Sequence, residues 1–382
     1  MRIAMIGQKG IPSRMGGVEI HVEELAKRLV RQGHSVTVYC RKTYCQELKQ
    51  EHEGISLKYI PSINTKHLDA IIYSVLATVH ALFHGFDVFH FHALGPSTVA
   101  FLPRLFGKKV VCTIHGLDWQ RDKWGGFARK YLQFGELCIA KFANRAITVS
   151  ENLVSYFRHK YQKEAVFIPN GVNMPVVKPA DLITSVYGLK GNDYILYLGR
   201  LVPEKGIHYL INAYNRLRPP MKLVIAGGSS HTTEYVQQIH DMAAGCEDIL
   251  FTGFVQGDVL EELFSNAWLY VLPSDLEGMP ISLLEAMSYG QACLVSDIEE
   301  NKAVVGKHGF YFSQGNINSL YQALKQLVSG HQSLEQVKAS GMSYVRESFK
   351  WDDVAIRHNK VYEELLEKRR HKRYGMVKAN KT

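Results

Sequence analysis

The chain has 382 residues, of which 46% are hydrophobic and 21% are charged, a composition that excludes an intrinsically disordered protein. This length is too great for one ordinary domain and suits two. The net charge of +9 favours an anionic partner, which could be a phosphate compound, a membrane surface or nucleic acid.

The first forty residues predict a strand, a glycine-rich loop, a helix and a second strand. The helix, at 18–32, has an apolar stripe at Val22, Leu25 and Leu29, which is the spacing of one buried face. Strand-like runs then alternate with helical patterns, and this alternation predicts a parallel sheet covered on both faces. The predicted strands of this half are 3–6, 35–39, 88–92, 110–114, 146–149 and 166–168.

Turn residues between Pro169 and Pro175 interrupt the pattern and mark the predicted domain boundary. A second α/β series follows, with predicted strands at 194–198, 222–226, 249–252, 268–272, 293–296 and 309–312. The fold class is therefore α/β, with two Rossmann-like domains and ligands beyond the carboxyl ends of the strands. Residues 1–171 are predicted to form an N-terminal domain and residues 172–350 a C-terminal domain. Residues 351–370 are predicted to form a helix that packs back towards the N-terminal domain, and residues 371–382 a basic tail.

The cysteines and the apolar segments indicate in which cellular compartment the protein is expected. The six cysteines include no CxxC pair, so free thiols are expected rather than metal ligands. Residues 1–6 lead directly into a strand, without the pattern of a signal peptide. The longest apolar stretch, 68–83, is interrupted by polar residues and is too short to cross a bilayer. The sequence predicts a cytoplasmic protein, with peripheral contact at the inner membrane face as a further expectation.

Two glutamates, Glu277 and Glu285, stand eight positions apart and follow a buried strand. Gly278 and Pro280 between them suit a loop that opens a helix, because the missing N–H of proline costs least in the first turn. Eight residues span a little over two helical turns, so both carboxylates can face one elongated ligand. The N–H groups at the start of this helix would attract an anion.

Arg200 and Lys205 follow the strand at 194–198 and supply the fixed positive charge that a diphosphate requires. Each motif has an ordinary interpretation, since paired glutamates and loop cations are often solvated surface. Their order, each after a hydrophobic strand, favours a site for a molecule with a sugar at one end and a diphosphate at the other.

Further motifs extend over nearly the whole chain and carry a resemblance to a known family. They are Gly16-Gly17-Val18-Glu19, His115-Gly116, Val149-Ser150-Glu151, Pro169-Asn170-Gly171-Val172, Gly199-Arg200 with Lys205-Gly206, Gly253-Phe254-Val255, and the Glu277/Glu285 pair. With them the chain resembles the retaining glycosyltransferases of family 4. That family has the GT-B fold, two Rossmann-like domains whose parallel sheets face each other across a cleft. Residues 7–12 and 115–119 resemble a bacterial subgroup around rhamnosyltransferases of surface-polysaccharide assembly.

The resemblance implies an N-terminal acceptor domain, a C-terminal donor domain and the following donor contacts. Arg200 and Lys205 hold the diphosphate, and Glu285 accepts from the ribose hydroxyls. Glu277 and backbone N–H groups around Gly278 and Met279 hold the sugar, whereas Pro280 has no N–H to give.

Other positions take their roles from the same resemblance. Val255 offers main-chain groups to the base. Gly16 and Gly17 bring bare backbone close to the phosphate, where a side chain would collide. His115 faces the transferred sugar and, with Arg200, Lys205 and Glu277, completes the predicted catalytic set.

This set of residues suits a transfer without metal or cofactor, because two cations and a helix N-terminus can stabilise a departing diphosphate. The sequence has no Asp-x-Asp to chelate a divalent ion. His90, His92 and His115 raise a metal-site alternative, which is disfavoured because no carboxylate partner is positioned by spacing. UDP or dTDP is the expected nucleotide.

The acceptor side is less defined. Trp119, Arg121 and Lys123 form a basic-aromatic patch that suits a diphosphate-lipid headgroup, with an ordinary solvated face as the alternative. Lys66, His67 and the apolar helix to Phe83 suit either a membrane-facing surface or a buried core helix. The expected acceptor is a glycan linked to polyprenyl diphosphate, and no nucleic acid partner is expected.

Three other functions fit parts of the pattern. A nicotinamide dehydrogenase fails because the first loop lacks Gly-x-Gly-x-x-Gly and the second strand ends without an acidic residue. A nucleotide-sugar epimerase of the same fold lacks a convincing acid/base set. A non-catalytic nucleotide-sugar-binding subunit stays open, although the intact Arg200, Lys205, Glu277 and Glu285 argue against it.

Overall fold

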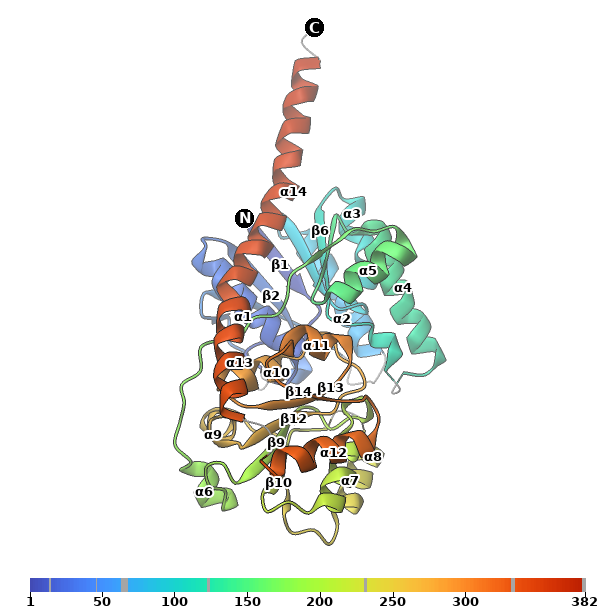
Figure 1. Ribbon diagram of the computed structural model, residues 1–382. Coiled ribbons are helices and arrows are strands. Elements are labelled where there is room, and N and C mark those ends of the chain that lie inside the picture. Colours follow the sequence, from blue (N-terminus) through green and yellow to red (C-terminus); the bar gives the residue numbers. More distant parts are fainter. Residues whose placement is uncertain are drawn as a thin grey trace. The chain divides into compact units, whose positions relative to one another are not determined.

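The computed structural model describes residues 1–13, 15–45, 47–62, 68–121, 124–229, 232–330 and 334–379. The chain divides into two compact units (Figure 1). Unit 1 comprises 1–120, 124–170 and 351–382, and unit 2 comprises 121–123 and 171–350.

Unit 1 is built on an eight-stranded sheet within the described residues, with strand order β3-β4-β2-β1-β5-β6-β7-β8. All neighbours are parallel except β3 and β4. The strands are β1 Arg2–Ile6, β2 Ser35–Arg41, β3 Glu51–His52, β4 Ile55–Ile60, β5 Val88–His92, β6 Lys109–Ile114, β7 Arg145–Thr148 and β8 Ala165–Phe167.

The helices of unit 1 include one from the end of the chain. Helices α1 and α14 lie side by side (Figure 1), and Arg28 on α1 donates to Asp352 on α14 at 2.6 Å. Helix α14 thereby joins the unit formed by the first half of the sequence. The α-helices are α1 Gly17–Arg31, α2 Leu68–Leu82, α3 Phe101–Leu105, α4 Gly126–Phe142, α5 Glu151–Tyr161 and α14 Trp351–Ala379. Short 3-10 helices are η1 Lys42–Tyr44, η2 Pro96–Val99 and η3 Asp118–Gln120.

Unit 2 is built on a parallel sheet, six-stranded in the described residues, with order β11-β10-β9-β12-β13-β14. The strands are β9 Tyr194–Leu198, β10 Lys222–Ala226, β11 Ile249–Gly253, β12 Leu269–Leu272, β13 Cys293–Ser296 and β14 Phe310–Phe312. The helices are α6 Leu182–Tyr187, η4 Pro203–Lys205, α7 Ile207–Leu217, α8 Thr233–Ala243, α9 Asp258–Asn266, α10 Ile281–Ser288, α11 Glu299–Val305, α12 Ile317–Val328 and α13 Leu334–Ser348.

The predicted strands are present with bounds that are unchanged or shifted by at most two residues, and the α/β class is confirmed. Strand β4 was not anticipated, although Ile55, Leu57 and Ile60 are buried and the polar residues between them are not. The apolar stretch after residue 67 forms α2, which buries Tyr73 and Ala77 and exposes another face. Helix α2 is therefore buried on one face and exposed on another, between the two predicted alternatives of a core helix and a surface helix.

Within the ranges that the structure describes, every helix is too short or too polar to span a membrane.

Helix α4 packs against the segment after β5 at a point where only glycine fits. A Cβ added to Gly135 would lie 2.0 Å from the carbonyl oxygen of Leu94, far inside any real contact. At Gly126, where the same helix starts, an added Cβ would meet no described atom within 4 Å beyond its own helix and chain neighbours. The close approach at Gly135 therefore fixes how α4 sits on the sheet.

We predict that Gly135→Ala destabilises the protein by about 1–3 kcal/mol, because helix and loop must move apart. Chemical denaturation of the full chain measures this cost. Gly126→Ala is the matched control and should leave stability unchanged or slightly higher, since alanine restricts the unfolded chain. Equal effects of the two substitutions would contradict the packing argument.

Candidate functional site

The loops that follow β9 and β12 leave the same edge of the unit 2 sheet. The two strands are parallel neighbours, with Leu196 opposite Tyr270. Parallel neighbours end at one edge of a sheet, so segments far apart in sequence meet there. The loop after β9 carries Arg200 and η4, and the loop after β12 carries Glu277 and leads into α10.

These two loops are held against each other through backbone contacts. Gly206 has φ +66°, and a Cβ at this position would lie 2.0 Å from the carbonyl oxygen of Pro273. The Asp275 N–H donates to the Glu204 carbonyl at 2.9 Å. Glycine at position 206 is required both for the left-handed conformation and for the close approach.

Lys205 and Glu277 form an ion pair across the two loops. Their side chains are only 13% and 8% exposed, respectively. Ser274 donates to the same carboxylate oxygen of Glu277 at 2.7 Å. The structure thus brings together two side chains that the sequence placed in separate motifs, and it adds Ser274, which was not among the predicted site residues.

Positive charge concentrates around this pair. Burial lowers the pKa of Lys205 below its usual range, and Glu277 opposes that shift. The charges of Arg200 and of Arg121, which groups with unit 2, lower the pKa of Lys205 further. A dianionic ligand would relieve this crowding of cations.

Helix α10 begins beside the ion pair. Pro280 is its N-cap residue, and Glu285 lies inside the helix, as the spacing predicted. Tyr270 on β12 donates to Ser282 on α10 at 2.9 Å, which fixes the helix against the sheet. Met279 packs against the unit 2 core, so the turn before the helix is anchored as well. The amides of the first turn have no partner within the helix itself and carry a partial positive charge.

Backbone groups approach one another closely at the neighbouring strand ends. Gly227 after β10 has φ +151°, and a Cβ there would lie 1.8 Å from the Gly199 carbonyl oxygen. The Gly227 N–H donates to the Gly253 carbonyl at 2.8 Å. Val255, two residues after Gly253, is half-buried against the core. The ends of β9, β10 and β11 are therefore closely packed near Val255, whose main-chain groups were predicted to contact the base.

In unit 1, Gly16 and Gly17 lie at the start of α1. A Cβ at Gly16 would lie 2.5 Å from a carboxylate oxygen of Glu19. The other oxygen of Glu19 accepts from the Lys9 N–H at 2.9 Å and so holds the glycine-rich loop. Glycine at position 16 leaves room for this carboxylate, which is a structural reason for part of the motif.

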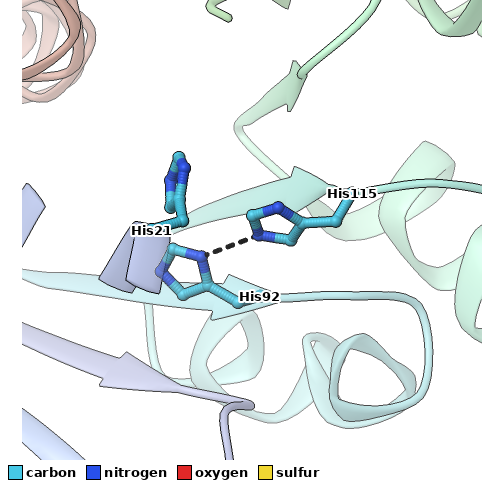
Figure 2. Close-up of side chains that lie close together, drawn as sticks. All are labelled: His21, His92 and His115. Carbon is cyan, nitrogen blue, oxygen red and sulfur yellow. Dashed lines mark hydrogen bonds between the residues drawn. The ribbon is translucent and has the colours of Figure 1, made fainter. Parts of the chain in front are cut away.

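Histidines from three elements converge at the carboxyl edge of the unit 1 sheet (Figure 2). His92 ends β5, His115 follows β6, and His21 comes from α1. His92 Nδ1 lies 3.3 Å from His115 Nε2, and His21 Nδ1 lies 2.9 Å from Asn170 Oδ1. His21 was not predicted from the sequence, although this position stands four residues before Leu25 on the apolar stripe.

His90, by contrast, is a structural histidine. Its Nε2 lies 2.7 Å from Thr113 Oγ1, and its Nδ1 lies 2.7 Å from the Tyr362 hydroxyl on α14. His90 is therefore held in place by these two contacts and is not part of the cluster of His21, His92 and His115. His90 stands two residues before the strand end, where side chains of the core and of α14 occupy both of its ring nitrogens.

Burial sets the charge of the three converging imidazoles. It lowers the pKa of His21 to about 4, against the opposing effect of the hydrogen bond with Asn170. It also holds the pKa of His92 and His115 well below its usual value, and for these two residues neighbouring histidines act in the same direction. All three are neutral near pH 7, so each ring has one nitrogen that donates and one that accepts.

Trp119, from the predicted acceptor patch, forms a hydrogen bond to a buried carboxylate rather than lying free on a solvated surface. The Trp119 indole donates to Glu136 at 2.7 Å, and this fully buried carboxylate also accepts from Tyr156 and Lys160. Arg121 groups with unit 2, and Lys123 lies outside the described residues. Lys66 and His67 lie outside them as well.

Two family models match the chain. Residues 15–174 match the model described as Glycosyltransferase Family 4, and residues 183–343 match the model described as Glycosyl transferases group 1. Together the matches take in most of the sequence. The chain therefore consists largely of these two glycosyltransferase domains.

Relatives and solved structures agree with this assignment. An uncharacterized glycosyltransferase of Methanocaldococcus jannaschii is 28% identical over 96% of this chain and 99% of its own. The UDP-Gal:alpha-D-GlcNAc-diphosphoundecaprenol alpha-1,3-galactosyltransferase of Escherichia coli is 28% identical over 63% of this chain and 65% of its own. A sucrose-phosphate synthase from Thermosynechococcus elongatus has a TM-score of 0.83 at 22% identity, covering 96% of this chain and 99% of that one. The fold is GT-B.

A stability prediction follows from the Lys205–Glu277 pair. Lys205→Met leaves a buried carboxylate without its counter-ion and should cost about 3–5 kcal/mol. The double variant Lys205→Met/Glu277→Gln should be more stable than the sum of the two single losses predicts, because no unpaired charge remains. Chemical denaturation of the wild type, the two single variants and the double variant gives the coupling free energy between Lys205 and Glu277. Strict additivity would show that the pair does not interact energetically.

Proposed function

We propose that the protein is a retaining, metal-independent glycosyltransferase that moves a hexosyl or deoxyhexosyl group from a nucleotide diphosphate sugar to a glycan. The observation that carries the proposal is the buried Lys205–Glu277 pair, in which Lys205 feels the charge of Arg200 and Glu277 lies on the loop that leads into α10. Two cations and a helix N-terminus are what a departing diphosphate requires.

In this proposal the ion pair opens when the donor binds. The diphosphate binds Lys205 and Arg200, and its negative charge replaces the carboxylate of Glu277 beside the ammonium group of Lys205. Glu277 is then available to accept hydrogen bonds from sugar hydroxyls, while Glu285 accepts from the ribose. The exchange keeps Lys205 paired in both states, so the ammonium is never left buried alone.

The chemical step follows from the same groups. The bond between the anomeric carbon and the phosphate oxygen breaks, and positive charge grows on the sugar as negative charge grows on the diphosphate. Arg200, Lys205 and the α10 amides stabilise that negative charge. The acceptor oxygen bonds to the same face of the sugar, and its proton passes to the departing phosphate. No protein nucleophile is required, and the roles of Gly16, Gly17, Val255 and His115 stay predictions.

The donor and acceptor are proposed by chemistry and relatedness. The Escherichia coli relative is named for a UDP-sugar donor and a lipid-diphosphate acceptor, which supports UDP, with dTDP as the second candidate. The net charge of +9 supports an acceptor linked to polyprenyl diphosphate at the inner membrane face. Leu76 and Val79 on α2 and Phe83 just after it are exposed and supply apolar surface for such contact.

A binding screen followed by product analysis tests the proposal. UDP- or dTDP-sugars should raise the melting temperature of the full chain, since ligand binding stabilises the native state. Incubation with the best donor should transfer the sugar with its anomeric configuration retained, as read by NMR, and without added metal. A glycan on polyprenyl diphosphate should be a better acceptor than the same glycan in water-soluble form.

Lys205→Met should lower donor affinity by about 10–100-fold, the loss of one charge-assisted contact. Lys302→Met is the matched control, because this lysine is an exposed residue of unit 2 paired with Glu299. Undiminished transfer by Lys205→Met, or inversion at the anomeric carbon, would overturn the proposal. Binding without transfer to any acceptor would instead indicate a non-catalytic subunit.

A further inference from the structure

The three histidines of unit 1 have the geometry of a metal site. One ring nitrogen from each of His21, His92 and His115 lies within 4.8 Å of the others (Figure 2). His21 and His92 are fully buried, and His115 is half-buried. The three side chains come from a helix, a strand end and a loop, so the backbone of a folded sheet holds them in place.

The distance between two of these nitrogens is informative. His92 Nδ1 and His115 Nε2 are 3.3 Å apart. Two nitrogens bound at about 2.0–2.1 Å to a tetrahedral zinc ion are separated by about 3.3–3.4 Å. The pair therefore already has the spacing of one tetrahedral edge, and an ion would replace the single hydrogen bond that now joins them.

His21 is oriented for the third position. Its Nδ1 is engaged by Asn170 Oδ1 at 2.9 Å, whereas its buried Nε2 has no hydrogen-bond partner among the described residues. An Nδ1–H donated to an oxygen leaves the lone pair of Nε2 as the ligand, which is how histidines in metal sites are commonly held. His92 Nε2 is likewise buried without a hydrogen-bond partner among the described residues, and it keeps its ring proton when Nδ1 of His92 is the ligand.

We propose that His21, His92 and His115 bind one late transition-metal ion, of which Zn²⁺ is the representative. Three imidazoles suit Zn²⁺, Co²⁺, Ni²⁺ or Cu²⁺ and do not suit Mg²⁺ or Ca²⁺, which prefer oxygen ligands. Each histidine keeps one ring proton on the nitrogen that is not a ligand. The fourth position is left to water or an anion. In the occupied site Nε2 of His115 is no longer available to a substrate hydroxyl.

Metal titration of the full chain, without an affinity tag, tests the site. Co²⁺ should bind one ion per chain with the strong visible absorption of a tetrahedral complex, and Zn²⁺ should displace it. Calorimetry with Mg²⁺ should give no binding at this site. His115→Gln is the main variant, because this half-buried residue can change with least risk to folding, and it should weaken Co²⁺ binding by at least about tenfold.

His84→Gln is the matched control. His84 is exposed and stacks on His80 one turn earlier on the same chain segment, so this pair is a competing two-histidine site. The control should bind Co²⁺ as the wild type does, and circular dichroism should show that both variants are folded. The absence of a one-to-one Co²⁺ complex in the wild type would overturn the proposal. Loss of binding in His84→Gln with retention in His115→Gln would overturn it too.

Discussion

One buried ion pair is central to the chemistry that we propose for unit 2. Lys205 and Glu277 come from loops that follow neighbouring parallel strands, and they meet because those strands end at one edge of the sheet. Burial lowers the pKa of Lys205, Glu277 opposes this shift, and the positive charges of Arg200 and Arg121 act in the same direction as burial. Such a site favours a ligand with more than one negative charge.

The tight backbone contacts around the pair give that charge a fixed position. Gly206 and Gly227 allow carbonyl oxygens of neighbouring loops to approach closer than any side chain would permit. Electrostatic stabilisation of a developing anion is effective when the charges need not reorganise during the reaction. In the proposed reaction, close packing of the loops would therefore keep these charges in place as the diphosphate departs.

Much of the fold of unit 2 and the positions of its charged motifs could be predicted from the sequence, because strands, turns and charged motifs are local signals. Glycine and proline after Glu277 indicated the helix that begins at Ile281, and the alternation of elements indicated the parallel sheets. What could not be predicted depends on tertiary contacts. His21 joins His92 and His115 only once α1 packs on the sheet, and the bond from Trp119 to Glu136 requires α4 to lie beside the loop after β6. Spacing along the chain contains no information on either contact.

The most direct test of the central claim compares UDP with uridine as ligands of the wild-type protein by calorimetry. If the cations of unit 2 hold the diphosphate, UDP should bind at least about 100-fold more tightly than uridine, a difference of about 2.7 kcal/mol. The advantage should shrink as salt is raised, since screening weakens the interaction. Equal affinities for the two ligands would contradict the account.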